Sequence, residues 1–106
     1  MAIKTGEVYN LLGLAYRAGK VVWGYNAVMA ALNNSNVYLL ILAVDSSPGL
    51  KAKFLATSQE YGIQAAVYGR KVTIGKAIGK PPCAVAGITD KNLARAIGQK
   101  VQEVGA

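Results

Sequence analysis

The sequence predicts an α/β fold, a three-layer α/β/α sandwich with a four-stranded central sheet, in a single domain that covers residues 1–106. Short β-rich segments alternate with helical segments along the whole chain. Strands that alternate with helices in this way form a sheet with helices on both faces. In addition, 53% of the 106 residues are hydrophobic, which is enough for a core without a disulfide or a metal.

The first half of the chain contains two helices and two strands. Apolar residues recur at helical spacing over residues 5–18 and predict the first helix. Residues 20–23 are β-branched and aromatic and predict a short strand, residues 24–26 predict a turn, and residues 27–32 predict a second helix. Residues 37–44 are almost continuously apolar, which is typical of a strand buried on both faces.

The second half continues the alternation. Residues 50–61 predict a helix with one apolar face, and residues 64–68 predict a short strand. A small helix follows at residues 72–78 and ends at a glycine, before a pair of prolines. Residues 83–88 predict a second buried strand, and the last helix is expected from residue 90 to about residue 97 or a little beyond.

The positive charge is concentrated in two stretches. The chain has 12 Lys and Arg against 5 Asp and Glu, a formal charge of +7. There is no acidic residue over residues 8–44 or 61–89, and these stretches carry six of the seven net charges. Such an excess indicates a polyanionic partner, and the alternative is a scattered charge that serves solubility.

Several classes of function are excluded by residue type. With one cysteine and no histidine, the chain has no intramolecular disulfide, no histidine-dependent triad and no ordinary zinc site. Only three residues separate Gly75 from Gly79, and Pro81 follows Lys80, so the glycine-rich stretch is not a phosphate-binding P-loop. We therefore expect no enzyme, no cofactor and no metal.

The sequence also predicts the cellular location of the protein. The longest apolar run, residues 37–44, is too short to cross a bilayer, and no signal pattern opens the chain. The lone cysteine suits a reducing compartment. A cytoplasmic protein without membrane association is expected.

The segment Leu12–Asn26, LGLAYRAGKVVWGYN, resembles the kink-turn RNA-binding ribosomal proteins, the superfamily of L-seven-Ae and L-thirty-e, and most closely its YlxQ-like bacterial branch. The similarity covers nearly the whole chain, because further motifs follow in the same order, at Ile41–Asp45, Ile74–Gly79 and Ala84–Ala86. The order and spacing together make the resemblance specific. The family fold is the same three-layer sandwich.

The resemblance implies binding, without catalysis, to an RNA that bends sharply at a bulge beside tandem sheared G·A pairs. By position, Gly24 and Asn26 would meet the G·A pairs, and Lys20 would neutralise a neighbouring phosphate. We expect a monomer with a ribosomal or ribosome-associated role on a structured RNA such as ribosomal RNA.

The loop at residues 79–85 matches the family segment that packs against the extruded bulge nucleotide. Lys80 would lie near the phosphate of that nucleotide, and unstacked bases are where RNA is read. The remaining expected RNA-binding residues are Lys76 and the apolar loop residues Pro82, Cys83, Ala84 and Val85. The site therefore requires that this loop and the end of the first strand lie side by side, as one cationic ledge.

Two positions depart from the family motif. Ala27 and Ala30 stand where Glu and Lys are usual, which predicts weaker or altered specificity, since each good base contact is worth about 1–3 kcal/mol. Tyr25 is expected either to stack on a base or to pack within the protein.

An alternative function is a protein-interaction module that kept the fold but lost specific RNA recognition. It is suggested by the two alanines and by an apolar stripe of Val28, Met29 and Leu32 on the second helix. This alternative requires the stripe to form an exposed apolar patch. Without the resemblance, Gly24, Gly75 and Gly79 could also serve only turns, close packing and helix ends.

Overall fold

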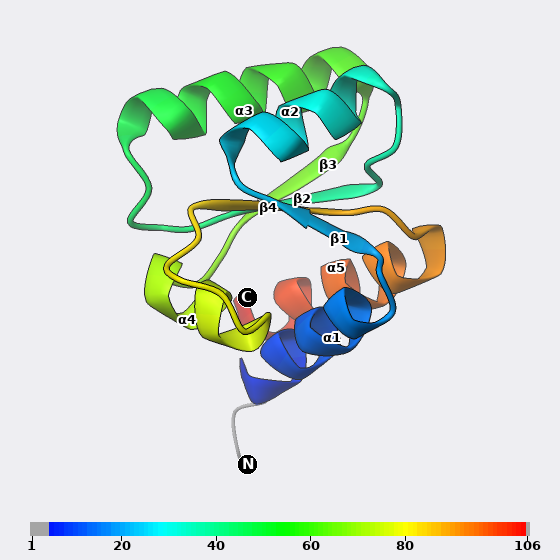
Figure 1. The fold of residues 1–106 in the computed structure, drawn as a ribbon, viewed down its shortest axis with the longest axis vertical. Coiled ribbons are helices and arrows are strands. Elements are labelled where there is room, and N and C mark those ends of the chain that lie inside the picture. Colours follow the sequence, from blue (N-terminus) through cyan, green and yellow to red (C-terminus); the bar gives the residue numbers. More distant parts are fainter. Residues whose placement is uncertain (1–4, 106) are drawn as a thin grey trace.

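The computed structural model describes residues 5–105 and contains the expected alternation of helices and strands (Figure 1). In chain order the elements are α1 (Thr5–Arg17), β1 (Val21–Trp23), α2 (Tyr25–Asn33), β2 (Leu39–Leu42), α3 (Pro48–Tyr61), β3 (Gln64–Val67), α4 (Lys71–Ala77), β4 (Val85–Ile88) and α5 (Lys91–Gly105).

The four strands form one mixed sheet in the order β1-β4-β2-β3. β4 is antiparallel to both neighbours, with Val21 opposite Ile88 and Leu42 opposite Val85. β2 and β3 are parallel. As a result, β1, β2 and β3 all finish at the end of the sheet where β4 begins, and α2, α3 and α4 start there.

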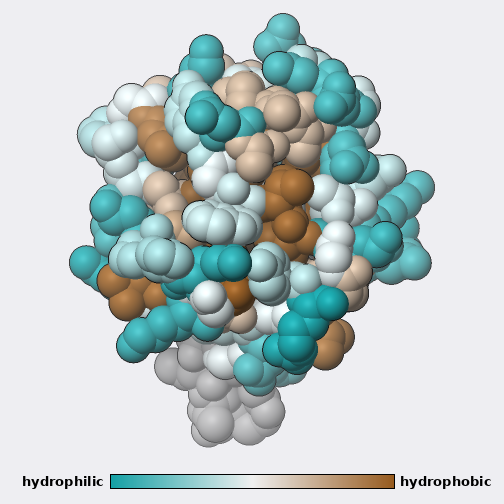
Figure 2. Space-filling model, in the orientation of Figure 1, coloured by the Kyte–Doolittle hydropathy of each residue, from teal (hydrophilic) through white to brown (hydrophobic). Residues whose placement is uncertain are grey.

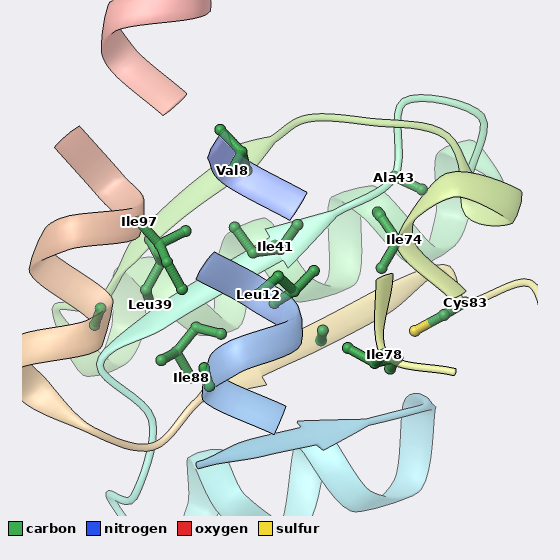
Figure 3. Packing of buried hydrophobic residues seen from close by; sticks show 13 residues of the cluster. Val8, Leu12, Leu39, Ile41, Ala43, Ile74, Ile78, Cys83, Ile88 and Ile97 are labelled. Carbon is green, nitrogen blue, oxygen red and sulfur yellow. The ribbon is translucent and has the colours of Figure 1, made fainter. Parts of the chain in front are cut away.

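Helices cover both faces of the sheet, which confirms the three-layer sandwich. α2 and α3 lie on one face, and α1, α4 and α5 lie on the other (Figure 1). Every residue of β2 and of β4 is buried, as the continuous apolar runs predict. The cluster under α1, α4 and α5 includes Leu12, Ile41 and Ile97 (Figure 3). The cluster on the other face is built around Phe54 and Leu40.

Two expectations about local structure need correction. Tyr25 and Asn26 belong to the first turn of α2 instead of a turn before it, because Gly24 with φ 91° and ψ 158° caps the helix directly after β1. The last helix runs to Gly105, well past residue 97. It continues because Val101 and Val104 pack against the buried cluster under α1, so that the apolar face extends over two further turns.

Candidate nucleic-acid interface

The β1–α2 junction and the start of β4 are joined by a backbone hydrogen bond. The N–H of Gly24 donates to the carbonyl oxygen of Val85 at 3.0 Å. Gly24 has no side chain to cap α2, and the space where a Cβ would lie is open to 4 Å. This open space adjoins the N-terminus of α2, and the first N–H groups of a helix, which have no partner within the helix, attract anions.

Asn26 and Tyr25 occupy the first turn of α2 and behave differently. Asn26 is exposed, so its amide is free to meet a ligand. The ring of Tyr25 is 45% exposed but packs edge-on against Phe54, with ring centroids 5.1 Å apart and an interplanar angle of 78°. Of the two roles expected for Tyr25, packing within the protein is the one that the structure displays.

Lys80 lies over two aromatic rings that come from different elements. Its Nζ is 5.6 Å from the ring centroid of Tyr16 on α1 and 5.6 Å from that of Trp23 at the end of β1. A cation over an aromatic face at this distance is attracted by the ring quadrupole. These contacts hold the half-buried Lys80 beside the strand that leads into Gly24.

The loop that carries Lys80 is folded back onto α4 at Gly75. The N–H of Lys80 donates to the carbonyl oxygen of Gly75 at 2.8 Å. A Cβ at position 75 would lie 2.7 Å from the carbonyl oxygen of Lys80 and would also collide with that of Pro81. Because only glycine leaves room for this approach, Gly75 determines where the loop lies.

The four apolar residues of the loop divide into two pairs. Pro82 is exposed and Ala84 is half-buried, so both present side-chain surface. Cys83 and Val85 are 3% and 1% exposed, and Cys83 points into the buried cluster beside Ile78 (Figure 3). The side chains of Cys83 and Val85 are therefore in the core, and these residues can act at the surface only through the backbone they position.

The structure places Lys20 at the opposite end of β1 from Gly24. The carbonyl oxygen of Lys20 accepts a hydrogen bond from the N–H of Thr89 at 2.9 Å, at the end of the sheet where β4 finishes. The three residues of β1 separate it from Gly24, and the four steps of extended chain span about 13 Å. Lys76 lies in the last turn of α4, beside Tyr16 and Arg17 of α1.

Three residues beside the ledge were not predicted from the sequence as RNA-binding residues: Tyr16, Arg17 and Trp23. Tyr16 and Arg17 come from α1, and nothing in their helical pattern shows which end of the sheet they face. Trp23 carried a usable signal, because a large aromatic residue directly precedes Gly24 and is 36% exposed in the structure.

Asp45, an acidic residue at this end of the sheet, is hydrogen-bonded and ion-paired to its own neighbours. The Asp45 carboxylate accepts the N–H of Lys71 at 2.8 Å and lies 3.8 Å from the Arg70 guanidinium. The hydrogen bond from Lys71 is the main cause that lowers the pKa of Asp45, with a smaller contribution from the charge of Arg70.

Within residues 5–105, the lysines near the ledge are not used in ion pairs. In the part of the chain that the structure describes, the ion pairs use Arg70 and Lys100, and none uses Lys76 or Lys80. The ledge formed by residues 24–26 and 80–85 is therefore positively charged.

The apolar stripe on α2 is not exposed. Val28 and Leu32 are 0% exposed, and Met29 packs against the same cluster around Phe54. The face drawn in Figure 2 shows small hydrophobic patches separated by hydrophilic side chains. The stripe thus belongs to the core, and the exposed patch that a protein-interaction module would need on α2 is not formed.

A mixed four-stranded sheet between two helical layers, with a glycine-initiated helix beside a lysine-bearing loop, defines a small α/β/α binding domain. The chain belongs to the ribosomal protein L7Ae/L30e/S12e/Gadd45 family, whose model matches residues 6–97. This confirms the resemblance found in the sequence. Within the described residues, none of the helices has the length and apolar character that a membrane crossing requires.

Two named relatives place the chain near the YlxQ-like branch of the family. It is 32% identical over 88 residues to the RNA-binding protein YlxQ of Bacillus subtilis (strain 168), across 83% of this chain and 88% of the relative. It is 33% identical over 89 residues to the RNA-binding protein YlxQ of Enterococcus faecium, across 84% of this chain and 85% of the relative. Both relatives are named as RNA-binding proteins, which agrees with the expectation that the chain binds RNA and is not an enzyme.

Solved structures share the fold. A protein of unknown function from Bacillus halodurans C superposes with a TM-score of 0.88 at 33% identity, over 95% of this chain and 99% of that one. The 15.5kD RNA binding protein of Giardia lamblia superposes with a TM-score of 0.79 at 22% identity, over 95% of this chain and 87% of that one. The second similarity extends the shared fold to a distant sequence.

Proposed function

We propose that this protein binds RNA and recognises a kinked or bulged structured element, such as a kink-turn in ribosomal RNA, at the ledge. The YlxQ relatives carry the name of RNA-binding proteins. The observation that carries the proposal is the Gly24–Val85 hydrogen bond, because it places the open N-terminus of α2 beside the loop of Lys80.

Each part of the ledge has a distinct chemical role. The N–H groups at the start of α2 donate hydrogen bonds to a phosphate, and Gly24 lets the RNA backbone approach them. The amide of Asn26 meets a base edge. Lys80 neutralises a phosphate, while Pro82 and Ala84 offer apolar surface to a base that has left the stack.

The residues outside the ledge have weaker roles in this proposal. Lys20, at the other end of β1, contributes a phosphate contact that positions the RNA without reading its sequence. Ala27 and Ala30 offer no polar group to a base, so the preferred RNA differs from that of relatives with the full motif. The protein acts as a monomer in the cytoplasm, in association with the ribosome.

Binding of a kink-turn RNA and of a straight duplex with the same base composition tests the proposal. The affinity for the kinked RNA should fall as the salt concentration rises. The slope of the logarithm of the binding constant against the logarithm of the salt concentration is set by the number of phosphates contacted. Asn26→Ala and Lys80→Ala should each weaken this binding about 5- to 100-fold, the effect of losing one good base or phosphate contact.

Two matched variants serve as controls. Asn92→Ala and Lys53→Ala remove the same side-chain types from exposed positions on α5 and α3, and both should bind as the parent does. Equal affinity of all five proteins, or equal binding of kinked and straight RNA, would refute recognition at the ledge.

A further inference from the structure

We propose that a hollow between α1 and α4 binds a single-stranded nucleotide that flanks the structured RNA, with Tyr16 and Trp23 as its stacking surface. This inference rests on the proposed function and extends it, because it adds an unpaired segment to the RNA that the protein binds. Apart from Lys80, it uses residues that the ledge does not include.

The hollow has a volume of about 340 Å³ and is lined by Gly13, Tyr16 and Arg17 of α1 and by Lys76 and Gly79 of α4 and its end. A Cβ at Gly13 would lie 2.7 Å from the carbonyl oxygen of Ala77, so the two helix backbones are in direct contact beside the hollow. Its size falls at the lower end of the range for small-ligand sites.

The hollow is continuous with the ledge through a series of contacts. Tyr16 lines the hollow, and its ring lies 5.6 Å from the Nζ of Lys80. The same Nζ lies 5.6 Å from the ring of Trp23, which directly precedes Gly24. An RNA strand that leaves the structured element at Gly24 therefore passes two aromatic rings before it reaches the hollow.

The charge around the hollow suits the phosphates of such a strand. Arg17 and Lys76 are exposed, Lys80 is half-buried, and no acidic side chain lines the hollow. None of these three cations takes part in an ion pair among the described residues. Cations that follow the backbone, together with aromatic faces for the bases, are the features that bind single-stranded nucleic acid.

The aromatic pair favours an unpaired strand over a duplex. A base within a helix is already stacked on both faces, so its surface is not offered to Tyr16 or Trp23. In the free protein the ammonium group of Lys80 lies over both rings, 5.6 Å from each centroid. A stacked base replaces that cation, which then turns to the phosphate of the same nucleotide.

Trp23 is the only tryptophan of the chain, so its fluorescence reports directly on this surface. The protein is titrated with a blunt kink-turn RNA and with the same RNA carrying a short single-stranded adenosine extension. The extension should quench the fluorescence of Trp23 and tighten binding about 5- to 100-fold, as expected for stacking of one base.

Variants separate the hollow from the ledge. Arg17→Ala should abolish the gain from the extension and leave binding of the blunt RNA within about twofold of the parent, since Arg17 lies outside the ledge. Tyr16→Ala should also abolish the gain and, because its ring holds Lys80 in place, should weaken binding of the blunt RNA as well. Trp23→Phe should retain part of the gain, because a phenyl ring still stacks. Tyr38→Ala removes a tyrosine that is 47% exposed beside a different hollow, with Lys91 and Arg95, and should keep the whole gain.

The outcomes distinguish this inference from the proposed function. If the blunt RNA binds but the extension adds neither affinity nor quenching, the inference is wrong and the proposed function stands. If the kinked RNA does not bind, the proposed function is wrong. Binding at the hollow is then tested with oligoadenosine alone. Quenching by oligoadenosine that Arg17→Ala removes supports the inference, and unchanged fluorescence overturns it.

Discussion

The backbone N–H of Gly24 donates a hydrogen bond to the carbonyl oxygen of Val85 at 3.0 Å. This bond extends the pairing of β1 with β4 by one residue beyond Trp23 and ends at the first turn of α2. It joins two segments that are far apart in the chain, so the position of the helix N-terminus relative to the Lys80 loop depends on the register of this strand pair.

We expect Gly24→Ala to destabilise the protein by about 1–3 kcal/mol, because an L-residue rarely adopts a φ of 91°. A Cβ at this position would meet open space, so the whole effect is a backbone effect. Urea denaturation measures it. Gly49→Ala in the first turn of α3 is the control, because its Cβ is also unobstructed and no positive φ is required. A Gly24 variant as stable as the Gly49 variant would contradict the argument.

Gly75→Ala is expected to destabilise the protein by about 1–3 kcal/mol, the cost of overpacking, although alanine is the better helix former. The added methyl group would collide with the carbonyl oxygens of Lys80 and Pro81 and push the loop away from α4. Moving Lys80 away from Trp23 should also change the emission of this tryptophan.

Gly98→Ala provides the comparison for Gly75→Ala. It also lies within a helix, and its Cβ would approach only the flexible side chain of Gln64, at 3.5 Å. This variant should be at least as stable as the parent. If thermal unfolding shows Gly75→Ala to be more stable than Gly98→Ala, the close approach of the loop is not the reason that position 75 requires glycine.

The thiol of Cys83 should react slowly with iodoacetamide at neutral pH. Burial raises the pKa of this thiol, and the residue is only 3% exposed, so the reactive thiolate is scarce and inaccessible. Mass spectrometry should find rapid labelling only after denaturation. Labelling at equal rates in the folded and denatured protein would show that Cys83 is outside the core.

Asp45→Asn should lower the urea midpoint at neutral pH. The N–H of Lys71 lowers the pKa of Asp45 below its unfolded value near 4, so the stabilisation by Asp45 is complete above that value and is lost as the pH falls through the folded pKa. The difference between parent and variant should therefore shrink in acid. Glu60→Gln, which removes an exposed carboxylate of α3, should show little effect at neutral pH, and a pH-independent Asp45 difference would refute the assignment.

Much of the fold could be predicted because the signals are local. Continuous apolar runs identify β2 and β4, helical spacing identifies α1, and Gly62 ends α3 in the left-handed conformation that glycine favours. The same local signals gave the wrong start for α2. Glycine is favoured both in turns and next to the first turn of a helix, so the sequence does not distinguish the two.

The candidate site was predictable only in part. Gly24, Asn26, Lys80 and Pro82 lie at one end of the sheet, as the family motifs imply. Lys20 lies at the other end, because the three extended residues of β1 carry it away from Gly24 although the two are close in sequence.

The sequence by itself determined the alternation of helices and strands, the buried strands and the excess of positive charge, since these depend on spacing and composition. Only the tertiary structure decided that the sheet is mixed, that Cys83 and Val85 turn inward, and that Lys80 lies over the rings of Tyr16 and Trp23. These features arise from pairing and packing between distant segments, where the partner of a residue depends on the register of whole elements and not on its neighbours in the chain.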